Sequence, residues 1–189
     1  MRIIAGSHRG AKLTRLATDK TRPTADRIRE ALFNILDGGK FGRVLENAHV
    51  IDAFAGTGAL GLEALSRGAL TACFIEQDRN ALSSLQANIN KLEMQSRSTI
   101  IPENITKLSN WPHPPAAVMF VDAPYKSGAG QAAVSAIRSI GGLAPQAILI
   151  LEMHKSEILD HNLLSLTTMK DNETRIYGKT ALHFITYSG

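Results

Sequence analysis

The chain has 189 residues, of which 44% are apolar and 20% charged, and its mean hydropathy is -0.05. This length predicts one domain with a short appendage, and the composition excludes a disordered chain, a collagen and a coiled coil. No apolar run approaches the roughly 18 residues of a membrane-spanning helix, and the first residues lack a signal peptide's apolar stretch, so we expect a soluble, cytoplasmic protein. The single cysteine, Cys73, excludes an internal disulfide and a Cys-rich zinc site.

Positive charge is concentrated in the first quarter of the chain. Residues 1–44 hold ten Lys and Arg against four Asp and Glu, a net charge of +6, whereas residues 45–189 carry -2. Clustered cations gain affinity for a polyanion by releasing counterions from its phosphates, which favours a nucleic-acid partner. A basic surface exposed only to solvent is the alternative. We predict a basic N-terminal hairpin and helix extension over 1–44 and a main body over 45–189, together one structural unit.

The N-terminal part is predicted to contain a hairpin and a helix. Residues 2–5 and 11–13 are short strand-like runs on either side of a basic turn that contains two glycines. Residues 24–36 have apolar side chains at helical spacing, and the two glycines that follow end the helix. Arginines cluster at the start of this helix, where its dipole favours an anion, namely Arg22, Arg27 and Arg29.

From residue 48 onward, short apolar runs alternate with amphipathic helices. The runs are typical of buried parallel strands, and the helices of right-handed crossovers between them. We expect strands at 49–54, 71–76, 98–101, 117–122 and 147–151. We expect helices at 59–66, 78–92 and 131–140. Three closing strands are expected at 163–168, 173–177 and 181–187, with an antiparallel edge hairpin. The pattern predicts an α/β protein with a doubly wound sheet.

The first predicted strand leads into a loop typical of nucleoside-cofactor sites. Gly56, Gly58 and Gly61 have the spacing GxGxxG, and Glu76 ends the next strand, where it can accept hydrogen bonds from ribose hydroxyls. Asp52 precedes the loop and would repel the pyrophosphate of a dinucleotide. S-adenosylmethionine carries an ammonium and a sulfonium and no phosphate, so this pattern favours it over NAD. Asp52 as a cap for the loop's own amides is an alternative compatible with cofactor binding.

A second motif, Asp122-Ala123-Pro124-Tyr125, follows the fourth predicted strand. Loops beyond the carboxyl ends of parallel strands share one crevice, so the motif is expected to face the glycine loop. Asp122 and the carbonyl of Ala123 or Pro124 can accept the two hydrogens of a nucleobase amine, and Tyr125 can stack on a base drawn out of its own stack. A strand-end turn with a buried tyrosine is the structural alternative.

The N-terminal segment and both motifs together resemble one family of RNA-modifying enzymes. Arg2-Ile3-Ile4-Ala5-Gly6, Thr21-Arg22-Pro23-Thr24 with the helix after it, and residues 54–69 are similar to the bacterial methyltransferases that form N(2)-methylguanine in 16S ribosomal RNA. The resemblance covers nearly the whole chain. It implies a class I S-adenosylmethionine-dependent methyltransferase fold, with a seven-stranded, mostly parallel sheet, an antiparallel edge hairpin and a small N-terminal β-hairpin.

The resemblance also implies partners and roles for individual residues. The substrate would be 16S rRNA in the small ribosomal subunit or its assembly intermediate, and we expect a monomer without a metal. Cofactor binding is carried over to Asp52, Gly56, Gly58, Glu76 and Asn104, with Asn104 beside the adenine. Guanine binding and catalysis are carried over to Asp122, Pro124 and Tyr125. From the charge of the N-terminal part we expect RNA contacts by Arg9, Lys12, Arg22, Arg27 and Arg29.

One position departs from the family pattern. Ala123 stands where the family has the first proline of Asp-Pro-Pro-Tyr or Asp-Pro-Pro-Phe. The backbone carbonyl survives this change but the fixed φ of proline is lost, so we expect a less preorganised loop and slower turnover. Three alternatives stay open: a methyltransferase acting on DNA adenine or a protein glutamine, a noncatalytic ribosome-binding relative, and an NAD-linked dehydrogenase.

Overall fold

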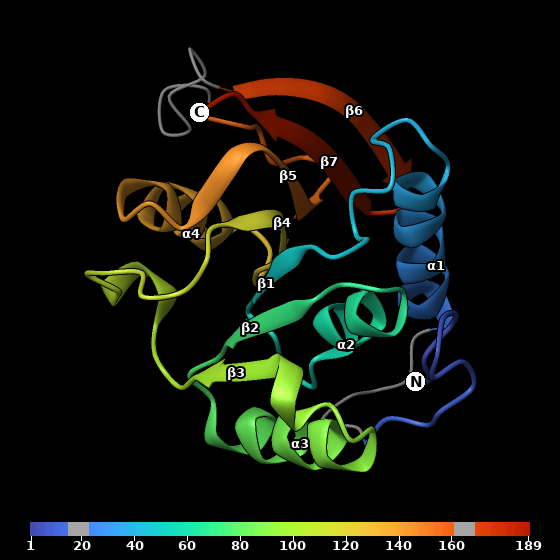
Figure 1. Ribbon diagram of the computed structural model, residues 1–189. Helices are drawn as coiled ribbons and strands as arrows, with labels where there is room; N and C mark the ends of the chain where they lie inside the picture. Colours follow the sequence, from blue (N-terminus) through green and yellow to red (C-terminus); the bar gives the residue numbers. More distant parts are fainter. Residues whose placement is uncertain (15–22, 161–168) are drawn as a thin grey trace.

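A seven-stranded sheet runs through the centre of the protein, in the order β3-β2-β1-β4-β5-β7-β6 (Figure 1). The computed structural model describes residues 1–14, 23–160 and 169–189. The strands are β1 (His49–Ala53), β2 (Thr71–Ile75), β3 (Ser98–Ile101), β4 (Ala116–Asp122), β5 (Leu143–His154), β6 (Met169–Tyr177) and β7 (Thr180–Tyr187). The first five pair in parallel and β7 is antiparallel to both its neighbours, which confirms the predicted fold class.

Helices cover both faces of the sheet. They are α1 (Pro23–Asp37), α2 (Ala59–Ser66), α3 (Arg79–Lys91) and α4 (Ala129–Ser139), with short 3-10 turns η1 (Gln95–Arg97) and η2 (Ile105–Lys107). In Figure 1, α1 and α2 lie on one side of the sheet and α4 on the other. Helix α2 has its predicted bounds, while α4 begins two residues before the predicted start, after Gly128 in the left-handed conformation. No helix within the described ranges is long and apolar enough to cross a membrane.

Two apolar layers pack on opposite faces of the sheet, because successive strand residues point to opposite sides. On one face, Phe74 and Phe120 lie in the layer that includes the apolar side of α1, and the rings of Phe33 and Phe120 are 5.5 Å apart. On the other face, Met119 and Val121 pack in the layer formed with α4. Strands covered on both faces have continuous apolar runs, which is why the sequence located them well.

The N-terminal hairpin docks on α2 through buried polar groups. Arg2 and Lys12 form a β-bridge. The carboxylate of Glu63, which is fully buried, accepts hydrogen bonds from the backbone N–H groups of Ile4 at 2.7 Å and Ala5 at 3.0 Å. The hairpin therefore packs directly on the helix that follows the glycine loop. The first of the three expected closing strands, 163–168, lies outside the described residues.

Candidate active site

The glycine loop connects β1 to α2 at the carboxyl edge of the sheet. Gly58 adopts a left-handed conformation with φ of 81°, and a Cβ built on it would lie 2.4 Å from Cδ1 of Leu85. A Cβ on Gly61 would lie 2.4 Å from the ring of Phe74. Gly61 is therefore required by packing, and Gly58 chiefly by its left-handed backbone. Gly56 differs, because a Cβ there would meet only a backbone oxygen at 4.0 Å, so the space beside it is open to a ligand.

Asp52 lies beneath this loop and is buried. Its Oδ2 accepts a hydrogen bond of 2.8 Å from the backbone N–H of Gly61, in the first turn of α2. The glycine at the N-cap of α2 has no side chain to cap the helix, so Asp52 does so from the neighbouring strand. Desolvation by burial raises the pKa of Asp52 to about 8. The hydrogen bond from Gly61 lowers this pKa, and the charges of Asp122 and Glu76 raise it further. The capping alternative is thus realised in the structure.

Glu76 and Asn104 meet at one shallow hollow beside the glycine loop. The Glu76 carboxylate accepts three backbone N–H groups, each at 2.8 Å, from Gly56, Gln77 and Asp78. Oδ1 of Asn104 accepts both the N–H and the hydroxyl of Thr106, which fixes its amide group. Phe54 completes the wall of the hollow, and its φ of 60° is unusual for a residue with a side chain. Sequence reasoning missed Phe54 as a site residue.

Asp122 ends β4 directly opposite Glu152 of β5. The Tyr125 hydroxyl donates a 2.7 Å hydrogen bond to Oε1 of Glu152 and lies 2.7 Å from the hydroxyl of Thr180. Its ring packs against His154, with centroids 5.9 Å apart, and 40% of the residue is exposed. Tyr125 is therefore anchored at its hydroxyl and open to solvent on part of its ring, unlike the buried tyrosine of the structural alternative.

The pKa values of these acids are shifted upward. Asp122 is exposed as a residue. Desolvation of its carboxyl group is nevertheless the larger cause that raises its pKa to about 7, and the charge of Glu152 is the smaller one. Burial also raises the pKa of Glu152. Burial raises the pKa of Tyr125 as well, so its hydroxyl stays protonated and available as a donor. Sequence reasoning missed Glu152, although an acidic residue at the carboxyl end of an apolar strand was a usable signal.

Four carboxylates from four neighbouring strands thus gather at one edge. Glu76 follows β2, Asp52 lies in β1, Asp122 ends β4 and Glu152 lies in β5. A cationic ligand would relieve their mutual repulsion, whereas a pyrophosphate would add to it. In the part of the chain that the structure describes, no group of three or more His, Cys, Asp or Glu could hold a metal ion. The cluster of acids therefore suits a ligand that carries a positive charge.

The loop after β4 is held by its own hydrogen bonds. Ala123 is buried in the apolar layer that contains α4. The Ser127 hydroxyl donates to the carbonyl of Pro124 at 2.5 Å, and Lys126 takes a positive φ of 59°. These contacts stabilise the turn from within, which offsets part of the preorganisation expected to be lost with the proline. The Pro124 carbonyl already accepts one hydrogen bond, so the Ala123 carbonyl is the better second acceptor for an amine.

The predicted RNA-binding cations divide into three groups. Arg9, Lys12 and Arg27 are exposed. Arg22 lies outside the described residues. Arg29 requires a correction, because it is only 7% exposed, donates to the backbone oxygen of Arg2 at 2.7 Å and pairs with Asp26 at 3.2 Å. Its guanidinium braces the hairpin against α1 and is not offered to a phosphate.

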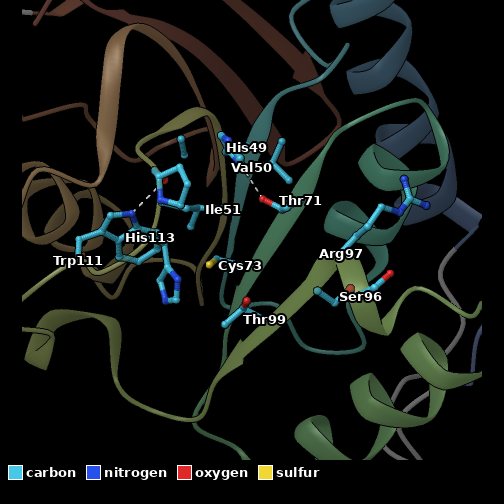
Figure 2. Close-up of a pocket in the computed structure, with 13 residues that line it drawn as sticks. His49, Val50, Ile51, Thr71, Cys73, Ser96, Arg97, Thr99, Trp111 and His113 are labelled. Carbon is cyan, nitrogen blue, oxygen red and sulfur yellow. Dashed lines mark hydrogen bonds between the residues drawn. The ribbon is translucent and has the colours of Figure 1, made fainter.

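A different pocket lies at the opposite, amino edge of the sheet (Figure 2). The first residues of β1, β2 and β3 line it together with Cys73 and the loop that carries Trp111 and His113. His49 and Thr71 contact each other across it at 2.7 Å, from Nδ1 to Oγ1. None of the predicted site residues lines this pocket.

Comparisons with known proteins agree with the fold. Residues 1–186 match the family described as Conserved hypothetical protein 95. Ribosomal RNA small subunit methyltransferase D of Escherichia coli is 37% identical over 152 residues, which cover 80% of this chain and 74% of that protein. The solved structure of the methyltransferase yhhF from Escherichia coli has a TM-score of 0.82 at 29% identity, covering 100% of this chain and 98% of that one.

A more distant structure shares the fold. The 16S rRNA N2 G1207 methyltransferase (RsmC) of T. thermophilus, solved with AdoMet and guanosine, has a TM-score of 0.68 at 18% identity, covering 92% of this chain and 45% of that one. The family match over nearly the whole chain excludes the NAD-linked dehydrogenase. The chain belongs to the ribosomal RNA small subunit methyltransferase D family, and it is a methyltransferase with the class I, S-adenosylmethionine-dependent fold.

Proposed function

We propose that this protein methylates the exocyclic N2 amine of a guanine in 16S ribosomal RNA of the small subunit, with S-adenosylmethionine as methyl donor. The observation that carries the proposal is the juxtaposition of Asp122 and Tyr125 with the carboxylate-lined glycine loop, in a chain of this family. The relatives are named for small-subunit rRNA, and the RsmC structure contains AdoMet and guanosine.

The cofactor would be held by groups from β1, β2 and η2. Glu76 would accept the ribose hydroxyls on lone pairs left free by its backbone bonds, and Asn104 would lie beside the adenine. Asp52 would release its proton when the cationic ligand binds and would then balance the positive charge. The open side of Gly56 would allow close approach of the ligand, and Gly58 would hold the loop conformation. When bound, S-adenosylmethionine supplies an electrophilic methyl group on a sulfonium.

The guanine amine would lie at the motif after β4. Its lone pair is delocalised into the ring, so the amine becomes a better nucleophile when its hydrogens are held by strong acceptors. Asp122 and the Ala123 carbonyl supply these acceptors, Pro124 shapes the turn, and Tyr125 offers a ring surface for stacking. Once the nitrogen bonds to the methyl carbon it must lose one proton. A carboxylate with a pKa of about 7 is suited to accept that proton near neutral pH.

The RNA itself would be held by cations of the N-terminal part. Arg9, Lys12 and Arg27 are exposed, and Arg22 remains a candidate from the sequence alone. Residues 1–44 would then bind the RNA, and residues 45–189 would carry out the methyl transfer. The substrate would be the small subunit or its assembly intermediate, the protein would act as a cytoplasmic monomer, and Ala123 would slow turnover.

Transfer of the methyl group to mapped RNA tests the function. Small subunits from cells lacking this gene would be incubated with the purified protein and labelled S-adenosylmethionine, and the modified base identified by mass spectrometry of nucleosides. We expect N(2)-methylguanine at one position. Asp122→Asn is the matched control, because it keeps the shape of the side chain and removes its charge.

Two alternatives have distinct outcomes in the same assay. Methyl-adenine in DNA or methyl-glutamine in protein, with no product in rRNA, would replace the proposed substrate. Binding of the subunit without any methyl transfer would indicate the noncatalytic relative. The presence of both Asp122 and Tyr125 favours catalysis over that reading.

A further inference from the structure

Glu152 is a carboxylate in the crevice to which the proposed reaction assigns no task. It is half-buried and lies directly across from Asp122 on the adjacent strand, so both side chains lie on the same face of the sheet. Neighbouring strands are about 4.8 Å apart, and two flexible carboxylates on them can converge on one small ligand. Two acids at this spacing repel each other unless donors lie between them.

The position of Glu152 is fixed by Tyr125. The Tyr125 hydroxyl donates to Oε1 of Glu152 at 2.7 Å. It also forms a hydrogen bond with the hydroxyl of Thr180, a residue that is 6% exposed. A carboxylate has about four lone-pair sites, so this anchoring leaves Oε2 of Glu152 available as an acceptor. The arrangement is a preset hydrogen-bond acceptor beside Asp122.

Guanine carries two adjacent donors on its Watson–Crick edge, the N1–H and the N2 amine. Two adjacent carboxylates match this pattern, with one acceptor for each donor. Resting on the proposed function, we propose that Glu152 accepts the N1–H of the target guanine while Asp122 accepts its N2–H, and that Glu152 thereby selects guanine over other purines. Adenine presents a lone pair at N1, which would face the Glu152 carboxylate without a hydrogen between them, and is rejected.

A purely structural role for Glu152 predicts a different dependence of activity on the purine. If Glu152 only holds Tyr125, its replacement lowers activity on every purine to the same extent. If Glu152 accepts a hydrogen bond from N1–H, the loss of activity depends on whether the substrate carries a hydrogen at N1. A substrate pair that differs at N1 but keeps the N2 amine separates the two roles.

The test uses guanosine and 2-aminopurine riboside at the mapped target position of otherwise identical RNA. 2-Aminopurine keeps the N2 amine and has a lone pair at N1. We expect the wild-type enzyme to prefer guanosine by about 10- to 100-fold in kcat/KM. In Glu152→Gln the amide oxygen can still accept from Tyr125, and the amide N–H can donate to the N1 lone pair, so the preference should fall at least about tenfold. The missing O6 of 2-aminopurine affects both enzymes equally.

Thr180→Val is the matched control, because it removes a contact of Tyr125 and leaves Glu152 in place; it should retain the preference of the wild type. Binding of both RNAs in the presence of S-adenosylhomocysteine repeats the comparison without turnover, should the variant be too slow to assay. An unchanged preference in Glu152→Gln would overturn this inference and leave the proposed function intact. Failure of the wild-type enzyme to methylate the guanosine RNA would overturn the proposed function instead.

Discussion

The two edges of the sheet carry opposite chemistry. At the carboxyl edge, Asp52 and Asp122 are acids whose pKa values are raised by loss of water. At the amino edge, the pocket in Figure 2 has no Asp or Glu among the lining residues that the structure describes, and its His49 and Thr71 satisfy each other. Cys73 in that pocket has its pKa raised to about 11 by burial, so its thiol is unreactive at neutral pH.

A cluster of acids with raised pKa values, more than the size of a hollow, therefore distinguishes the carboxyl edge, where we propose the chemistry, from the amino edge. Acids that repel one another destabilise the free protein, and a bound cationic ligand offsets this effect. Such clusters are therefore typical of functional sites. The pocket at the amino edge, whose described lining residues include no acid, has no such repulsion to relieve. The proline-rich loop between η2 and β4 forms one wall of the hollow at the amino edge, through Trp111, His113 and Pro114.

The two edges should differ most clearly in the response to Asp122→Ala. We expect methyl transfer to fall about 100- to 1,000-fold, because a reacting amine loses its charged partner. Affinity for S-adenosylmethionine should stay nearly unchanged, since the glycine loop is untouched. Single-turnover rates and calorimetry measure the two quantities. Cys73→Ala at the amino edge is the control and should keep wild-type turnover; equal losses in both variants would contradict the assignment of chemistry to the carboxyl edge.

The pH dependence of turnover should report the acid pair. The free enzyme has a pKa of about 7 at Asp122, and the base must be ionised to accept a proton. We therefore expect kcat/KM for the RNA, measured at saturating cofactor, to fall by up to about tenfold per pH unit below 7. Glu152→Gln should move this break to lower pH, because the charge of Glu152 raises the pKa of Asp122. A break at the same pH in both enzymes would show that the two acids are not coupled.

Asp52→Asn should separate cofactor binding from stability. Asparagine can still accept from the Gly61 N–H, so α2 remains capped, but it cannot ionise when a cationic ligand binds beside it. We expect affinity for S-adenosylmethionine to fall about tenfold, the equivalent of about 1.4 kcal/mol. Calorimetry measures this change. An unchanged affinity would mean that Asp52 only caps the helix.

The same variant should alter the pH dependence of unfolding. The pKa of Asp52 is about 8 in the folded protein and 3.8 for an ordinary aspartate, so between these pH values the folded state keeps a proton that the unfolded state has released. Stability contributed by this group is therefore present at low pH and is lost as pH rises toward 8. Asp52→Asn should remove this loss and raise the melting temperature at pH 8 by about 3 °C or more.

Much of the carboxyl edge was predictable because it depends on local sequence. The glycine loop and the motif at Asp122 each combine a strand, a turn and a helix within about twenty residues, so local sequence predicted where both loops lie, and Asp52 and Glu76 supported the prediction of a cofactor site. The bounds of α2 were predicted for the same reason, since Gly58 and Arg67 border a short, mostly apolar run.

What sequence reasoning missed depends on contacts between distant segments. Glu152 enters the site only because β5 pairs with β4 in the register that sets it opposite Asp122. Arg29 shares one face of α1 with Leu32, Phe33 and Leu36, but its hydrogen-bond acceptor, the Arg2 carbonyl, comes from the docked hairpin. Registers and docking of this kind are fixed by the packing of the whole molecule, and no local pattern encodes them.

Substitution of the hairpin cations should affect activity less than the variants above. It tests whether RNA affinity depends on these cations and not on a cation at the amino edge. Arg9 and Lys12 are exposed, so the double variant to alanine should weaken binding to small-subunit RNA and reduce the slope of log affinity against log salt by about 0.7 to 0.9 for each phosphate that is no longer neutralised. Arg97 is the matched cation at the amino edge, where it donates to the carbonyls of Leu65 and Ala69. Arg97→Ala should leave the slope unchanged. If the hairpin variant also keeps the wild-type slope, its charge is a solvated surface and the RNA must be held elsewhere.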